Sequence, residues 1–187
     1  DEGRCVDQAG DGGALGATYE YLPDPDRPGG RITRMTDQLG ATTTFHVNDA
    51  WQVERIVDPL GHVSTREWDE RNRLLAATDP LGRTTRIDRD ERGRPLVITR
   101  PDGSQQRFAY PNDGEPGAAG YDPITVELPD GSRWRNELDD HGRRVATIDP
   151  TGAVTRYGYD ERGRLSEVTD PLDAVTRIVC NDAGLPV

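Results

Sequence analysis

Two short motifs recur along this chain with a spacing of 21 residues, and this periodicity constrains the fold more than any other sequence feature. The glycine slot of a D-P-x-G motif falls at Gly40, Gly61, Gly82, Gly103, Gly131, Gly152 and Asp173. The glycine slot of a D-x-x-G-R motif falls at Gly30, Trp51, Asn72, Gly93, Gly114, Gly142, Gly163 and Gly184. One seven-residue insertion between Gly114 and Gly131 interrupts both series. Repeats of this length indicate stacked units that bury their apolar positions only together.

Both motifs have the chemistry of tight turns. Asp can accept hydrogen bonds from the backbone of its own turn, Pro presets φ at the next position, and Gly supplies a positive φ. Asn72 and Asp173 replace Gly with residues that tolerate left-handed geometry. Trp51 does not, so we expect the turn at residues 48–51 to differ from the others. We also expect local hydrogen bonding to account for the many aspartates.

The segments between the turns have the length and alternation of β-strands. Counted from the first glycine, the fifth and seventh residues form a mostly apolar or aromatic column: Phe45/Val47, Arg66/Trp68, Ile87/Arg89, Phe108/Tyr110, Asn136/Leu138, Tyr157/Tyr159 and Ile178/Cys180. The fourth and sixth residues are mostly polar. This period of two predicts one apolar and one charged face. After the second turn the apolar spacing is irregular, as in Leu165/Val168, which suggests a β-bulge there. Each unit is therefore strand, turn, strand, turn, and the predicted fold is an all-β antiparallel meander.

The composition fits this thin repeat better than a conventional core. Leu, Ile, Val and Phe make up just under a fifth of the 187 residues and the net charge is −11, which is the range of disordered chains, yet there are 11 aromatic residues. We expect disorder only at residues 1–16 and in the insertion near 115–122, with about seven to eight repeats over residues 17–187. The acidic balance argues against nucleic-acid binding. No apolar run reaches the length of a membrane span, and residues 1–20 lack a signal-peptide pattern.

The sequence offers few candidates for catalysis or metal binding, and we expect no catalytic, cofactor or metal site. His46, His62 and His141 occupy different phases of the repeat, so they should not converge. Asp24 and Asp26, near two glycines, have some likeness to a calcium loop, but Met35 stands where a bidentate acid is needed.

A column of arginines is the strongest charge pattern in the chain. It comprises Arg86, Arg107, Arg135, Arg156 and Arg177. Acids two residues further along, namely Glu67, Asp88 and Glu137, could interleave with it. We interpret the column as a solvated, mutually paired face; the alternative is a surface that contacts an enclosed cargo or a partner. The aromatic column is interpreted as packing, the alternative being a carbohydrate platform.

The two cysteines, Cys5 and Cys180, lie at opposite ends of the sequence. About 14 strands spaced by about 4.8 Å would separate them by tens of ångströms, whereas a disulfide needs Cα atoms within about 7 Å. We therefore expect no bridge between them, unless the sheet curls right round. Cys180 occupies an aromatic slot and is expected to pack as a small hydrophobic side chain.

Three segments of the chain resemble the RHS/YD repeat family. They are WDERNRLLAATDPLGRTTR (68–86), RDERGRPLVITRPDGSQQR (89–107) and YDERGRLSEVTDPLDAVTR (159–177). The family pattern is Y-D-x-x-G-R-L, a spacer, D-P-x-G and then T-R-x-x-Y. The likeness covers roughly residues 17–187. The tyrosine of the pattern is replaced at Trp68, Arg89, Leu138 and Cys180.

The resemblance implies a long sheet that curves and spirals into a hollow, cocoon-like shell. Similar shells occur in bacterial RHS polymorphic toxins, in the encapsulating components of Tc toxins and in animal teneurins. In the bacterial proteins the shell holds a C-terminal toxin domain, and a self-cleaving aspartyl protease core precedes that domain. No P-x-x-x-x-D-P-x-G-L core motif is present. We therefore expect repeat wall only, as a piece of a larger exported protein.

The resemblance thus implies a non-enzymatic structural module that encapsulates a toxin, with an extracellular or secreted location. Its expected partners are the enclosed toxin domain, the remaining shell of the same parent protein and a secretion system. Exposed sheet edges could also cause self-association. The alternative function is a cell-surface adhesion or carbohydrate-binding module that uses exposed residues such as Trp68 and Trp134.

Overall fold

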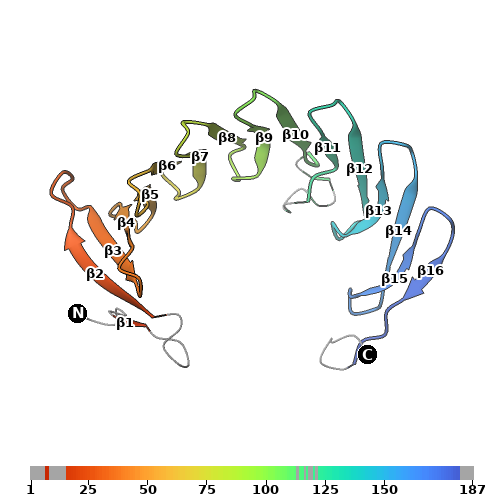
Figure 1. Ribbon diagram of the computed structural model, residues 1–187. Helices are drawn as coiled ribbons and strands as arrows, with labels where there is room; N and C mark the ends of the chain where they lie inside the picture. The colour runs from red at the N-terminus through yellow and green to blue at the C-terminus, as the bar shows by residue number, and fades with distance from the viewer. Residues whose placement is uncertain are drawn as a thin grey trace. The chain divides into compact units, whose positions relative to one another are not determined.

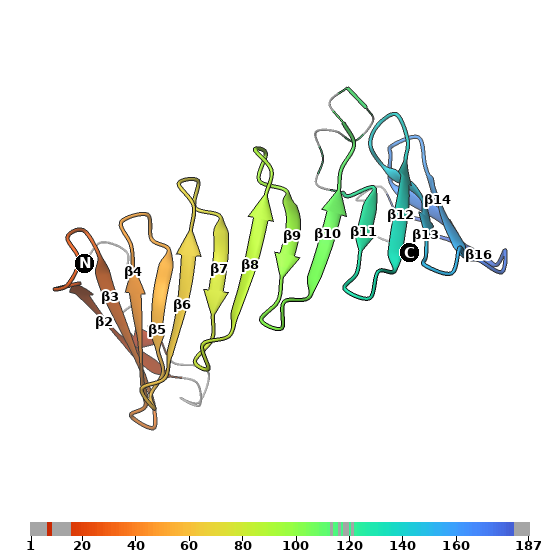
Figure 2. The same ribbon diagram turned by 90° about the horizontal axis from the view of Figure 1, so that it is seen from above.

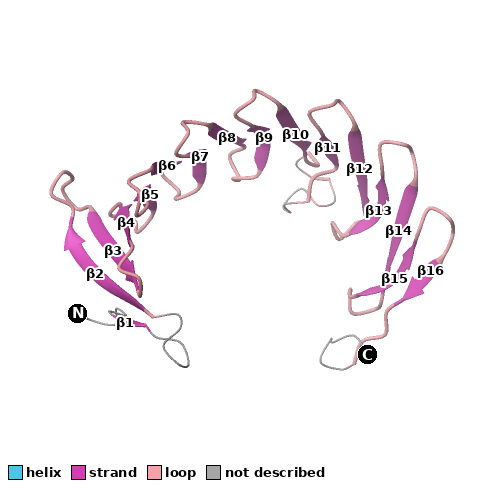
Figure 3. Cartoon of the chain, in the orientation of Figure 1, coloured by secondary structure: helices cyan, strands magenta, loops and turns pink. Residues whose placement is uncertain are grey.

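The computed structural model describes residues 7–8, 16–112, 114–115, 117, 120 and 122–181. Within these residues the chain consists of strands joined by turns, without helices (Figure 3). Accordingly, the described part of the chain has no helix able to cross a membrane. Cys5, Gly184 and nearly all of the segment 1–16 lie outside the described residues, so the expectations about them stay predictions. The all-β class expected from the repeat is confirmed.

The chain divides into two compact units. Residues 1–87 and 100–102 form the first unit, and residues 88–99 and 103–187 form the second. The first unit holds β1 (Asp7–Gln8), β2 (Ala17–Pro23), β3 (Arg31–Asp37), β4 (Thr42–Val47), β5 (Val53–Val57), β6 (Val63–Trp68) and β7 (Leu74–Thr78). β8 (Thr84–Arg89) continues from the first unit into the second. The second unit holds β9 (Pro95–Thr99), β10 (Gln105–Ala109), β11 (Thr125–Glu127), β12 (Arg133–Leu138), β13 (Arg144–Ile148), β14 (Val154–Tyr159), β15 (Leu165–Thr169) and β16 (Val175–Arg177).

Strand order in the sheet follows the order along the chain, from β1 to β16 (Figure 1). Every register that the structure defines is antiparallel, for example Tyr19 opposite Met35 in β2 and β3, and Ala146 opposite Arg156 in β13 and β14. Within the first unit, Figure 2 shows β4 to β7 lying side by side. The predicted antiparallel meander is therefore confirmed.

A β-bulge recurs at one phase of the repeat. The register shifts just before the second turn of a repeat, between Glu67 and Trp68 in β6 and between Gly158 and Tyr159 in β14. The same shift occurs in β4 and β12. In each case one extra residue follows the turn, which explains why the apolar spacing there departs from two. The bulge suggested by the sequence is thus present.

The two faces of the second unit differ in charge. Cross-strand partners share a face. One face, here the uncharged face, carries Phe108, Val126, Trp134, Asn136, Thr147, Thr155, Tyr157, Val168 and Thr176. The other, here the charged face, carries Arg107, Glu127, Arg133, Arg135, Glu137, Ala146, Arg156, Glu167 and Arg177. The charged residues of these strands are therefore confined to one face, as predicted, but apolar residues such as Ile148, Val154 and Val175 share that face with them.

Few side chains are deeply buried, because the sheet is a single layer. Among the described residues the buried hydrophobic ones are Ile32, Ala76 and Ala146, and no large side chain is fully buried. Ala76 is 1% exposed although it shares a face with its register partners Glu67 and Arg86. These long side chains form an ion pair of 3.7 Å across it. Charged side chains therefore cover the smallest apolar ones.

The turns keep one backbone geometry even where the glycine is replaced. Asn72 and Asp173 adopt φ of 60° and 63°, as expected. Trp51 also adopts a φ of 63°, and its N–H donates to the Asn48 carbonyl as in the other turns. The expectation that the 48–51 turn differs is therefore wrong. The slot assigned to Gly30 also needs correction, because the left-handed residue there is Gly29 at φ 80°.

The insertion packs against the turn that joins β12 to β13. A Cβ on Gly142 would lie 2.7 Å from the Gly117 Cα, so only glycine fits at this contact. The Gly120 carbonyl accepts a hydrogen bond of 3.4 Å from Arg94, and Asp122 forms an ion pair of 3.3 Å with Arg144. The described residues of this segment therefore make specific contacts within the second unit.

Candidate functional site

In the turns that end in an arginine, the aspartate uses both of its carboxylate oxygens within its own turn. In the turn after β12, the Asp139 Oδ1 accepts hydrogen bonds from the backbone N–H groups of His141 and Arg143, both at 2.9 Å. The Asp139 Oδ2 accepts one from the Arg143 Nε at 2.7 Å. The same arrangement occurs at Asp69, Asp79, Asp90 and Asp160. Local hydrogen bonding therefore accounts for the recurring aspartates.

This bonding holds the carboxylates in their charged form. The hydrogen bond from the Arg143 side chain lowers the pKa of Asp139 below its ordinary value of 3.8. The Arg83 side chain has the same effect on the pKa of Asp79. At Asp160, the backbone N–H of Arg164 is the largest cause of a lowered pKa. Because every shift is downward, these groups stabilise the turns as anions and are unsuited to act as general acids or bases near neutral pH.

The arginine of the second motif also stacks on an aromatic ring of the following repeat. The Arg94 guanidinium lies 4.4 Å from the centre of the Tyr110 ring, and that of Arg143 lies 4.7 Å from the Tyr159 ring. Arg94 is only 8% exposed. In these two repeats the arginine is thus hydrogen-bonded to the aspartate of its own turn and stacked on a tyrosine of the next unit, which links the D-x-x-G-R motif to that tyrosine.

Aromatic residues in the same slot also hydrogen-bond to the backbone one hairpin earlier. The Trp68 Nε1 donates to the Val53 carbonyl at 3.0 Å, and the Tyr159 hydroxyl donates to the Arg144 carbonyl at 2.7 Å. Sequence reasoning missed this role and the arginine stack. The constant 16-residue interval from Arg94 to Tyr110 and from Arg143 to Tyr159 is the signal that could have revealed them.

The histidines are engaged in separate local contacts. The His46 Nδ1 donates to the Asp24 Oδ2 at 3.0 Å, and its Nε2 accepts from the Arg55 guanidinium at 3.1 Å. Both ring nitrogens are thereby occupied, which leaves none for proton transfer or metal binding. The His62 Nδ1 lies 2.8 Å from the Asp58 Oδ2, and His141 is exposed. No two of these histidines share a partner among the described residues.

The segment that resembles a calcium loop is a turn with its own internal bonds. The Asp24 Oδ1 accepts from the Asp26 backbone N–H at 3.0 Å, while its other oxygen binds His46. Met35 lies within β3, opposite Tyr19. Among the residues that the structure describes, no three His, Cys, Asp or Glu side chains gather in a way that could hold a metal ion.

The arginine column is only partly paired in the way expected. Arg86 pairs with Glu67, one of the three acids singled out from the sequence. Arg177 pairs at 3.3 Å with Glu167, which the sequence pattern did not single out. Arg107 donates to the Gln105 side chain.

Cys180, beyond the last strand, is half-buried with a free thiol.

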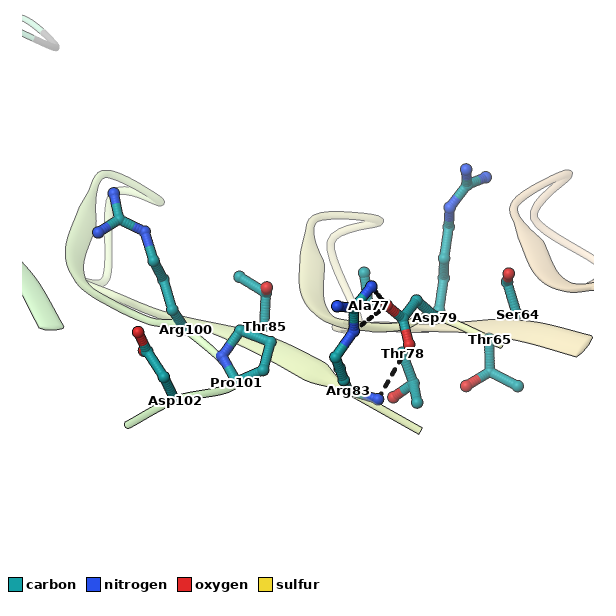
Figure 4. Close-up of a pocket in the computed structure, with 11 residues that line it drawn as sticks. Ser64, Thr65, Ala77, Thr78, Asp79, Arg83, Thr85, Arg100, Pro101 and Asp102 are labelled. Carbon is teal, nitrogen blue, oxygen red and sulfur yellow. Dashed lines mark hydrogen bonds and ion pairs between the residues drawn. The ribbon is translucent and has the colours of Figure 1, made fainter. Parts of the chain in front are cut away.

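A groove of about 730 Å³ in the first unit lies between neighbouring hairpins (Figure 4). Its wall includes the turn of Asp79, where Arg83 folds back onto the carboxylate at 2.7 Å. The Thr78 hydroxyl is hydrogen-bonded to that of Thr84 at 2.8 Å. The lining contains no histidine or cysteine, so it offers no paired nucleophile and base. Its geometry is that of a gap between repeats.

Comparison with known proteins identifies the repeat. The family model of the RHS Repeat matches residues 52–84, 68–105 and 139–175. No curated protein matches the chain. Among solved structures, a TcdB2–TccC3 complex matches at 14% identity and a TM-score of 0.43, over 89% of this chain and 13% of that one. The Tc holotoxin pore of Photorhabdus luminescens matches at 13% identity and a TM-score of 0.33, over 99% of this chain and 15% of that one.

The chain therefore spans only 13% to 15% of the length of these two structures. The family matches cover the turns and strands from β5 to β9 and from the β12–β13 turn to β15. These are the segments whose Asp, Arg and Gly positions build the turn network described above. Residues 52–105 and 139–175 of the chain are therefore RHS repeats.

Proposed function

We propose that this chain is part of the wall of a shell that encloses the C-terminal toxin domain of a secreted RHS polymorphic toxin. Its structural role as an RHS repeat module follows from the family. The step to encapsulation is supported mainly by the way in which the motif side chains are used. Asp139 binds Arg143 and the backbone of its own turn, so the charged motif residues stabilise the sheet and are not free to bind a substrate.

Mechanically, such a wall acts by excluding other molecules. A single-layer sheet encloses a large space with few residues, and its hydrogen-bonded strands leave no gap wide enough for a protease. The enclosed domain, and the further RHS repeats of the same parent protein, are the partners in this proposal. β16 offers an edge for such repeats: among the described strands it pairs only with β15, and its three residues are exposed. The parent protein acts outside the producing cell, delivered by a secretion system.

To test this proposal, the turns of the repeats are destabilised by substitution while every repeat is kept. In the parent protein, Asp69, Asp139 and Asp160 are replaced together by Ala, which removes three turn networks. Adjacent exposed acids of the same turns, Glu70, Asp140 and Glu161, are replaced by Ala as the matched control. Protease cleavage of the region that follows the repeats is timed, and growth of the producing cells is followed.

We expect the turn variant to expose that region to protease at least tenfold faster than the control, and to slow the growth of its host. Equal cleavage of the wild type, the control and the turn variant would contradict encapsulation. A parent protein that binds cell surfaces while its C-terminal region stays accessible would instead support the adhesion alternative.

A further inference from the structure

The groove between neighbouring hairpins of the first unit carries more positive than negative charge (Figure 4). Its charged lining residues are Arg66, Arg83, Arg100, Asp79 and Asp102, although the chain as a whole has a net charge of −11. The volume of about 730 Å³ lies within the range of about 300–1,000 Å³ usual for small-molecule sites. The groove is therefore large enough for a small ligand, and its charge favours an anion.

Two of these arginines stand where the repeat places other residues. The slot of Arg66 is uncharged in the other repeats, at Phe45, Ile87, Phe108, Asn136, Tyr157 and Ile178. The slot of Arg100, which opens the first turn motif, is otherwise acidic or apolar, at Asp37, Asp58, Asp79, Leu128, Asp149 and Asp170. In a repeat protein the sibling units serve as internal controls. Because they form the same strands and turns without these arginines, the fold does not need either cation.

The protein leaves both of these cations unpaired. The side chains of Arg66 and Arg100 are exposed and make no hydrogen bond or ion pair with another residue that the structure describes. The two acids of the groove are engaged elsewhere. The Arg83 guanidinium lies 2.6 Å from the Asp79 carboxylate, and Asp102 has a partner other than Arg66 and Arg100. Two positive charges of the groove are therefore available to a ligand.

Small side chains form the floor of the groove between these two arginines. Arg66 lies opposite Ala77 in β7, and Ala77 lies opposite Thr85 in β8, so the three share one face of the sheet. Figure 4 shows Ala77 and Thr85 between Arg100 at one end of the groove and Ser64, from the strand of Arg66, at the other. A ligand that lies on Ala77 and Thr85 is thus flanked by two guanidinium groups.

We propose that this groove binds a small phosphate monoester. Its phosphoryl group carries about two negative charges at neutral pH, which match the charges of Arg66 and Arg100. A single carboxylate would leave one of the two arginines unpaired. Each guanidinium presents its N–H donors as a planar fork that fits two phosphate oxygens.

The hydroxyl groups of the same face complete the donor set. The side chains of Ser64 and Thr85 have no hydrogen-bond partner among the described residues, so both hydroxyls can donate to a phosphate oxygen. The acidic balance of the chain disfavours a nucleic-acid polymer, so the ester that fits is a small one. This site goes beyond the proposed encapsulation and does not depend on it.

The test uses the 187-residue chain with phenyl phosphate, inorganic phosphate and benzoate at equal ionic strength. Binding is followed by NMR through the side-chain Nε–H signals of the arginines. Arg66→Ile installs the residue of the same slot at Ile87, and Arg100→Asp installs the motif residue found at Asp79, so both variants preserve the repeat. Arg156→Gln is the matched control, because Arg156 is exposed and has no partner among the described residues but lies outside this groove.

We expect phenyl phosphate to saturate the Arg66 and Arg100 signals at millimolar concentration, and benzoate to bind about tenfold more weakly. Each groove variant should lose about tenfold in affinity for phenyl phosphate, and Arg156→Gln should lose none. Circular dichroism checks that all variants keep their strand content.

The proposal is overturned if phenyl phosphate shows no saturable binding, or if the two groove variants bind it as tightly as the wild type. Benzoate binding as tight as that of phenyl phosphate would equally overturn it, since the groove would then select any anion. Binding of inorganic phosphate without binding of phenyl phosphate would exclude a monoester as the ligand.

Discussion

The turns at residues 139–143 and 48–52 have the same backbone and different side chains. In the first, the Asp139 N–H donates to the Arg143 carbonyl at 2.9 Å; in the second, the Asn48 N–H donates to the Gln52 carbonyl at 2.9 Å. The side-chain oxygen of the first residue accepts from the fifth N–H in both turns, at 2.9 and 2.8 Å. The turn therefore depends on an oxygen acceptor, which Asp and Asn both supply.

The difference lies in how a cation is held against an aromatic ring. In the 139–143 turn, Arg143 is paired with Asp139 and stacks on Tyr159 of the following hairpin. The 48–52 turn has no arginine. There the Trp51 ring instead contacts the guanidinium of Arg31, which comes from β3 and lies 3.9 Å from the ring centre. The same kind of contact thus survives with its partners exchanged. A repeat can therefore lose the arginine and glycine of its motif when an arginine from a neighbouring strand restores the contact between a cation and an aromatic ring.

Acid should separate the two turns most strongly. The pKa of Asp139 is lowered by its bond with Arg143, so its stabilisation is complete above the unfolded value of 3.8 and is lost as the pH falls through the folded value. Asn48 does not titrate. We expect protection of the Arg143 amide to fall relative to that of Gln52 by up to about tenfold per pH unit below 3.8.

Hydrogen exchange followed by NMR in one sample measures this ratio, after the rate of each amide is divided by the intrinsic rate for its own sequence and pH. A ratio that stays constant from pH 5 to pH 2 would mean that the Asp139 carboxylate does not stabilise its turn.

Glycine substitution should separate the second-motif turn that the insertion contacts from a free turn. Gly142 and Gly152 have φ of 76° and 89°, so alanine strains both. Only at Gly142 would the new Cβ meet a backbone atom, the Gly117 Cα at 2.7 Å. Urea unfolding should show a loss of about 3 kcal/mol for Gly142→Ala and about 1 kcal/mol for Gly152→Ala. Equal losses would mean that the insertion moves aside at no cost.

Restoring the motif aspartate in the degenerate turn should destabilise it. The Asn48 Nδ2 donates to the Glu54 Oε1 at 3.3 Å, and an aspartate would place two carboxylates there. We expect Asn48→Asp to lose about 1–2 kcal/mol at pH 7 in urea unfolding, with a smaller loss at pH 4. Asp49→Asn, at the exposed neighbouring position, is the control and should be neutral. A more stable Asn48→Asp variant would show that the motif letter matters more than its surroundings.

The smallest effect concerns the tyrosine that completes the full turn. Tyr159→Phe removes the hydroxyl that donates to the Arg144 carbonyl at 2.7 Å, and should cost about 1 kcal/mol in thermal or urea unfolding. Tyr157→Phe, whose hydroxyl has no partner among the described residues, should leave stability unchanged. If both variants behave alike, the aromatic ring and not its hydroxyl holds the neighbouring hairpin.

The repeat, the strands, the alternation of faces and the bulge could all be predicted, because each follows from local rules repeated at one phase. Asn72 and Asp173 were predictable for the same reason. Trp51 was not, since tryptophan is not a residue that favours a φ of 63°, and its ring contact is with Arg31, which lies on β3 and outside the turn. Likewise, the Gly117–Gly142 contact arises from an insertion that has no phase in the repeat. The 21-residue pattern cannot predict a contact between residues that the repeat does not relate to each other.

The same limit applies to the groove lined by Arg144, Tyr157 and Tyr159. Arg144 and the two tyrosines differ in type from the residues at the same phase of the other repeats, but Asp122 lies in the insertion, and only the fold brings it within 3.3 Å of Arg144. Spacing could indicate that this repeat is unusual. It could not indicate that its unusual residues share a groove.

The strand order from β1 to β16 has a consequence for how the chain forms. Ala146 pairs with Arg156, only ten residues away, and the other registers are similarly short in sequence. Low contact order favours rapid folding, because little loop entropy is lost before each pairing is rewarded. The hairpins can therefore form one after another, from the N-terminus onward, as the polypeptide leaves the ribosome. When one end of the chain is pulled, the strands should detach in order from that end, and the extension of the chain should increase in a series of small steps.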